Sequence, residues 1–216
     1  MIASAMVAGI IAGSTLFIVQ RWTTLPLIYQ AEFHEQERSR VSSPTNDPPQ
    51  GETTRSAYTL LGDIFVAIGF GLMLSAAYVL SDKFGLRHGI FWGLAGFTTF
   101  QLGPALVVPP ALPGLQLVSL STRQGMWLIA AFSTGLGLAL VIRERKSMKF
   151  TGVILMVLPA MLKFLIPVAP QPAPVFTDVS TLESQFIFWT LACSLLMWLI
   201  LGAASCWIFD RLQSSE

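Results

Sequence analysis

Long apolar blocks alternate with shorter polar segments along this chain. Six blocks have the length and the near absence of charge that a membrane helix needs: about residues 2–20, 57–80, 88–108, 125–143, 150–168 and 185–208. A helix of about 20 apolar residues crosses the hydrocarbon core of a bilayer, which is about 30 Å thick. Because lipid cannot hydrogen-bond the backbone, each block is expected to be helical. The pattern predicts an all-α integral membrane protein, with one transmembrane domain over residues 1–216 and about six transmembrane helices.

The composition agrees with lipid as the solvent. Hydrophobic residues make up 53% of the chain and charged residues 12%, whereas soluble domains carry about 25% charged residues. The net charge of +1 gives no strong basic field, so membrane lipid is an expected partner and nucleic acid is not. The first block could be a signal peptide, but no Lys or Arg precedes it and no clear cleavage site follows it, so we interpret it as a retained helix.

The polar segments differ in character. Residues 21–56 form the longest one, and its second half, Val41 to Arg55, is rich in Ser, Thr, Pro and Asp and is predicted to be irregular. Several prolines predict rigid or extended backbone in segments 109–124 and 169–184. Segments 81–87 and 144–149 are short and basic. The positive-inside rule then predicts that both termini face the cytoplasm of a bacterial inner membrane.

Small residues recur at helical spacing. Gly9 and Gly13 are four residues apart, as are Gly89 and Gly93, and such pairs allow two helix backbones to approach closely. Other glycines within the apolar blocks suggest a tightly packed bundle: Gly62, Gly69, Gly71, Gly135 and Gly137. The two cysteines, Cys193 and Cys206, fall on roughly opposite faces of one predicted helix, so we expect packing residues and not a disulfide.

The segment that follows the first block carries the most suggestive polar cluster. It contains Glu32, His34 and Glu35, and in a helix the two glutamates, three residues apart, share a face. Carboxylate and imidazole groups suit borderline divalent metals such as cobalt, nickel or zinc. A solvated charged face is the alternative interpretation of the same residues.

Three charged residues lie in or beside apolar blocks. Asp63 is about six residues, or roughly 9 Å, into the second block, where an acid usually faces a bundle interior or a watery cavity. It either binds a cation or pairs with a neighbour near the outer interface. Lys163, between two prolines of the fifth block, either snorkels to the interface or pairs with Asp63. Arg123 follows a proline-rich turn. Either this segment has only a structural role, or Arg123 binds an anion such as a lipid phosphate.

Motifs for catalysis are lacking. The sequence contains no Gly-x-Ser-x-Gly, no Cys/His pair and no phosphate-binding loop. We therefore do not expect an enzyme, a bound cofactor or ATP binding by this chain.

Three stretches carry a resemblance to a known family. They run over residues 25–32 with Glu35, over residues 89–97 continuing to the proline-rich turn at 109–114, and over Arg123-Gln124 at the start of the next helix. In order, spacing and helix count the chain resembles the predicted cobalt transporter subunit CbtA. The resemblance implies a membrane subunit for cobalt uptake that serves cobalamin synthesis, with cobalt as the transported ion and a small CbtB-like membrane subunit as partner.

The resemblance places the family's acidic motif on Glu32 and Glu35. It also shows two departures: the family commonly has a glutamate where this chain has Ala111, and a histidine after the proline of the fifth helix, where Ala160 and Met161 follow Pro159. We therefore carry two hypotheses. The first is a divalent-metal transporter subunit with Glu32, His34, Glu35 and Asp63 as candidate ligands. The second is a non-transporting accessory subunit of a larger membrane complex, which the two missing ligands favour.

Overall fold

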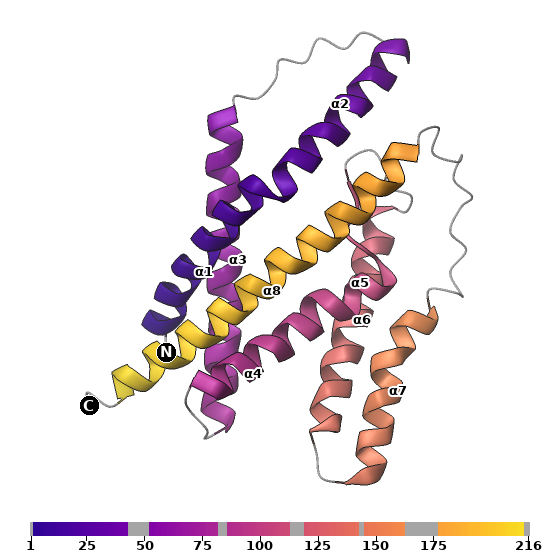
Figure 1. Ribbon diagram of the computed structural model, residues 1–216. Coiled ribbons are helices and arrows are strands. Elements are labelled where there is room, and N and C mark those ends of the chain that lie inside the picture. The colour runs from indigo at the N-terminus through magenta and orange to yellow at the C-terminus, as the bar shows by residue number, and fades with distance from the viewer. Residues whose placement is uncertain are drawn as a thin grey trace. The chain divides into compact units, whose positions relative to one another are not determined.

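A computed structural model describes residues 2–42, 52–81, 86–112, 119–142, 145–162 and 177–213. Helices make up nearly all of these residues, and no strand occurs among them, which confirms the all-α fold (Figure 1). The helices are α1 (Ile2–Trp22), α2 (Thr24–Ser42), α3 (Glu52–Ser81), α4 (Leu86–Phe97), the π-helix η1 (Thr98–Leu102), α5 (Gly103–Val107), α6 (Leu120–Val141), α7 (Lys146–Leu162) and α8 (Thr177–Gln213).

Five helical stretches in the described residues are long and apolar enough to cross a membrane: Ile2–Trp22, Thr53–Tyr78, Leu86–Val107, Leu120–Val141 and Ser180–Arg211. They correspond to five of the six predicted blocks, and the prediction of an α-helical membrane protein is confirmed. The remaining block, 150–168, is described as far as Leu162, where α7 ends. The rest of that block lies outside the described residues.

Several helices continue past the predicted apolar blocks. Of the stretch Val41 to Arg55, predicted to be irregular, residues 41–42 end α2 and residues 52–55 begin α3, and the others lie outside the described residues. The start of α6 lies five residues before block 125–143, and that of α8 eight residues before block 185–208. Hydropathy marks only the part of a helix that lies in lipid, whereas polar residues such as Ser and Thr extend the same helix into the interface.

The chain divides into two compact units. The first comprises Met1–Pro26, Gln36–Gly96 and Ala192–Glu216, and the second comprises Leu27–Glu35 and Phe97–Leu191. Each is described by itself below. The prediction of one transmembrane domain over the whole chain stays a prediction.

In the first unit, glycines of α1 lie directly on the backbone of α3. A β-carbon on Gly9 would lie 2.6 Å from Cα of Ile68, and one on Gly13 would lie 2.6 Å from Cα of Ile64. Figure 1 shows these two helices side by side. Only residues without a side chain allow this approach, so the predicted role of the Gly9/Gly13 pair is confirmed.

The second glycine pair, Gly89 and Gly93 on α4, faces α8 in the same way. The backbone of Gly202 lies against Gly89, and the backbone of Trp198 lies against Gly93. Across the α3–α8 contact, the hydroxyl of Tyr78 donates a hydrogen bond to the carbonyl oxygen of Gly202 at 3.1 Å and lies 3.0 Å from Oγ of Ser205. All these residues are buried, so helix contact here combines close backbone packing with a polar link.

In the second unit, α6 and α7 pair along their lengths (Figure 1). Gly137 and Gly152 meet there, since a β-carbon on Gly137 would lie 2.6 Å from the carbonyl oxygen of Gly152.

Two glycines of α3 in the first unit differ from this pattern. The tight-packing prediction is wrong for Gly62 and Gly69, because no described atom lies within 4 Å of the place that a β-carbon would take at either position. Both glycines therefore sit on an open face of α3. The two cysteines are buried and form no disulfide with each other, as predicted.

Candidate functional site

The predicted metal ligands next to the first helix lie on α2. This segment is helical, so Glu32 and Glu35 are one turn apart, as the spacing predicted. Leu27 and Ala31, at positions four residues apart, are buried, whereas Glu32 is half-buried and Glu35 is exposed. The two glutamates of α2 therefore lie beside the buried apolar residues Leu27 and Ala31. The side chain of His34 lies outside the described residues.

Asp63 lies deeper in its helix than the sequence indicated. The membrane-crossing stretch of α3 begins at Thr53, ten residues before Asp63, which places the carboxyl group about 15 Å along the helix axis. That is close to the middle of the stretch Thr53–Tyr78. The prediction of roughly 9 Å counted from the start of the apolar block, whereas the helix itself starts earlier, at Glu52.

The carboxylate of Asp63 is incompletely satisfied. The residue is half-buried, and its Oδ2 is buried without a hydrogen-bond partner among the described residues. Gly13 of α1 lies over its backbone, since a β-carbon there would be 2.8 Å from the Asp63 carbonyl oxygen. An acceptor oxygen buried within a membrane-crossing helix without a donor is costly, and acids inside such helices commonly mark ion pathways.

The four predicted ligands do not form one described cluster. Within the part of the chain that the structure describes, no three His, Cys, Asp or Glu side chains gather to hold a metal ion. Glu32 and Glu35 belong to the second unit and Asp63 to the first. The ligand set Glu32, His34, Glu35 and Asp63 therefore stays a prediction. Lys163, its suggested partner, lies outside the described residues.

A cavity of about 560 Å³ lies in the second unit between η1–α5 and the first turns of α6. Its first wall comes from a local change of helix geometry. Pro104 has no amide hydrogen and its ring crowds the preceding turn, and directly before it the helix widens into η1, where the N–H of Gly103 donates to the carbonyl oxygen of Thr98. Gln101 of η1 lines the cavity together with Pro104 and Ala105.

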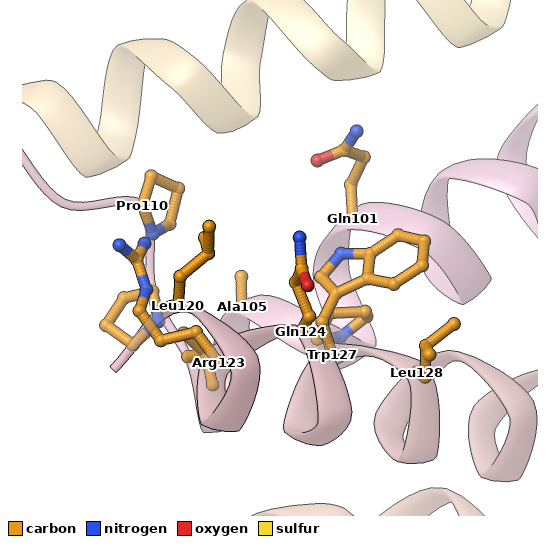
Figure 2. A pocket seen from close by; sticks show the side chains of 11 residues that line it. Gln101, Ala105, Pro110, Leu120, Arg123, Gln124, Trp127 and Leu128 are labelled. Atoms are coloured by element: carbon orange, nitrogen blue, oxygen red, sulfur yellow. The ribbon is translucent and has the colours of Figure 1, made fainter. Parts of the chain in front are cut away.

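The opposite wall is the start of α6. Ser119 caps this helix: its Oγ accepts a hydrogen bond from the backbone N–H of Thr122 at 3.4 Å. The following residues, Arg123, Gln124 and Trp127, face the cavity. Figure 2 shows the Arg123 side chain beside Pro110, and the side chains of Gln101 and Gln124 in the same space. The ring of Trp127 stacks on Phe100 with centroids 6.3 Å apart, which fixes this part of the wall.

This cavity is chemically unlike the carboxylate sites. Its charged group is the cation Arg123, and its other walls are mostly apolar, so it suits an anion or an amphiphile and not a bare metal ion. Sequence reasoning singled out Arg123 and the prolines but missed Gln101. The available signal was an amide inside an apolar block, three residues before a proline.

The fold and these sites define a polytopic α-helical membrane protein with intramembrane and interfacial polar groups. The family model described as "Probable cobalt transporter subunit (CbtA)" matches residues 1–210. The chain therefore belongs to this family, as the sequence resemblance indicated. Neither a curated protein nor a solved structure matches the chain. The family is described as one of transporter subunits, which implies a partner subunit and does not favour the accessory-subunit alternative.

Proposed function

We propose that this chain is the membrane subunit through which a divalent metal ion, cobalt, enters the cytoplasm. The family match over residues 1–210 supports the class of function. The structural observation that carries the proposal is Asp63, a half-buried carboxylate near the middle of a membrane-crossing helix, with one oxygen that lacks a hydrogen-bond partner among the described residues.

In this proposal, the glutamates of α2 bind the ion first, and Asp63 provides a negative charge within the membrane. Glu32 and Glu35 lie one helical turn apart, a spacing at which two carboxylates can bind one divalent cation. Conduction requires ligands that bind the ion and also release it. Several sites with few ligands each, at different positions along the chain, meet that requirement better than a single site that surrounds the ion completely. Both termini lie in the cytoplasm of a bacterial inner membrane, and a small CbtB-like chain is the partner subunit.

The first experiment measures cobalt accumulation at low external cobalt in host cells that lack their own copy of the protein. Complementation with the wild-type gene restores accumulation, since the host supplies any partner subunit. Complementation with the double variant Glu32→Gln/Glu35→Gln is expected to leave accumulation at the level of uncomplemented cells. Glu183→Gln, which removes a charge from α8, is the matched control.

The outcomes separate the ligand assignment from the function. If the double variant accumulates cobalt at the wild-type level, with equal amounts of protein in the membrane, the assignment of Glu32 and Glu35 as ligands is contradicted. The proposed function is not contradicted by that result. If the wild-type gene restores accumulation of nickel or zinc but not of cobalt, the transported ion is that metal and not cobalt. Restoration of no metal would contradict the proposed function.

A further inference from the structure

The cavity between η1–α5 and α6 lies where two stretches that are long and apolar enough to cross a membrane come to their ends. The stretch Leu86–Val107 ends three residues before Pro110, and the stretch Leu120–Val141 begins three residues before Arg123. Three residues of the helix α6 advance about 4.5 Å, and residues 108–110 follow α5 as a non-helical segment. Both walls of the cavity therefore end near the boundary between hydrocarbon and headgroups, where lipid phosphates are found.

The polar end of the cavity is built for an anion. Arg123 is half-buried, and no described residue forms an ion pair or hydrogen bond with its guanidinium. A guanidinium presents five N–H donors in a planar fork, a geometry that matches a phosphate group with two parallel hydrogen bonds. The amides of Gln101 and Gln124 also line the cavity and add neutral donors, in Figure 2 on the Trp127 side of Leu120.

The rest of the cavity is built for hydrocarbon. Leu120 and Leu128 of α6 line it, yet they remain 67% and 48% exposed, so among the described residues the cavity is open along an apolar face of α6. Trp127, held against Phe100, forms a rigid apolar side. A volume of about 560 Å³ far exceeds the space of a single phosphate ion and lies in the range of sites for larger small molecules.

We propose that this cavity binds an anionic phospholipid. Arg123 holds the phosphate, and the glycerol and the first acyl carbons lie against Trp127 and Leu128. Free inorganic phosphate shares the chemistry of the headgroup, but it would leave the apolar walls uncovered. The inference is independent of metal transport, because none of the proposed metal ligands lines the cavity.

Native mass spectrometry of the purified, delipidated full chain tests the proposal. The protein is titrated separately with phosphatidylglycerol, with phosphatidylcholine and with inorganic phosphate. We expect the wild type to retain phosphatidylglycerol more tightly than phosphatidylcholine. Because charge-assisted hydrogen bonds are lost, Arg123→Gln is expected to weaken binding of phosphatidylglycerol about tenfold or more.

Three further variants keep the test decisive. Ala105→Phe fills the cavity while the Arg123 charge stays, and is expected to weaken binding of phosphatidylglycerol, which separates a cavity site from general attraction to a positive surface. Arg123→Lys keeps the charge and is expected to bind between the wild type and Arg123→Gln; if Arg123→Gln does not fold, Arg123→Lys and Ala105→Phe carry the test. Arg145→Gln, exposed before α7, is the matched control and is expected to bind as the wild type does.

Two results would overturn the proposal. One is binding of phosphatidylglycerol by Ala105→Phe or by Arg123→Gln at the wild-type level, in protein that elutes as folded. The other is tight binding of inorganic phosphate that depends on Arg123, with no preference for phosphatidylglycerol, which would make the cavity a site for a soluble anion.

Discussion

Gly13 of α1 lies against the backbone of Asp63 on α3, at a distance that leaves no room for a side chain. A β-carbon at position 13 would be 2.8 Å from the carbonyl oxygen of Asp63. The glycine thus brings α1 onto the turn of α3 that carries the intramembrane carboxylate. Packing in the first unit and the placement of the candidate ion site depend on the same contact.

Gly13→Leu is expected to destabilise the protein because the obstruction is backbone, which cannot move aside as a flexible side chain does. Overpacking of this kind costs about 1–3 kcal/mol. The measurement is the temperature at which half of the detergent-solubilised protein is lost from the folded peak in size-exclusion chromatography. Gly62→Leu, on the open face of α3 with no described atom within 4 Å, is the control. Equal stability of the two variants would contradict this packing.

Tyr78→Phe removes a buried hydrogen bond and leaves the aromatic ring in place. The hydroxyl donates to the carbonyl oxygen of Gly202 at 3.1 Å and meets Ser205 at 3.0 Å. Hydrogen bonds between membrane helices contribute about 0.6–2 kcal/mol, so unfolding in mixed micelles is expected at a lower fraction of denaturing detergent. Tyr58→Phe, at a position 71% exposed, serves as the control. A Tyr78→Phe protein that unfolds together with Tyr58→Phe would show that the bond contributes little.

Asp63→Asn keeps the volume of the side chain and removes its charge. If the carboxylate attracts the transported cation within the membrane, cobalt accumulation is expected to fall to that of cells without the protein. Asp63→Glu, which retains the charge, is expected to keep part of the activity. Asp210→Asn, at an exposed position on α8, is the control for loss of one negative charge. Accumulation at the wild-type level in Asp63→Asn would remove Asp63 from the ion path.

The orientation in the membrane is tested at the two ends of α6. Ser121, in the first turn of α6, and Ser147, in the first turn of α7, are exposed, and the membrane-crossing stretch Leu120–Val141 separates them. In intact cells, a membrane-impermeant maleimide is expected to label Ser121→Cys and not Ser147→Cys, because the basic segment 144–149 is predicted to be cytoplasmic. The two native cysteines are buried, so their background labelling is expected to be low. The reverse pattern would place both termini outside.

The sequence by itself determined the class of protein. Apolar blocks of about 20 residues specify helices in lipid because the bilayer thickness and the need to satisfy backbone hydrogen bonds leave no other solution. The spacing of Gly9 with Gly13, and of Gly89 with Gly93, likewise indicated close helix contacts. Two family features, the acidic motif on α2 and the proline-rich turn, were also visible without coordinates.

Only the tertiary structure decided which glycines face a neighbour and which face outward. Gly62 and Gly69 lie in the same helix as Gly71, yet only Gly71 meets a partner, Ala5 of α1, among the described residues, because contact depends on the rotation of one helix against another and not on local pattern. The depth of Asp63 and the cavity around Arg123 and Gln101 were hidden for the same kind of reason. Helix starts outside the apolar blocks, and side chains brought together from separate helices, leave no periodic signal in the sequence.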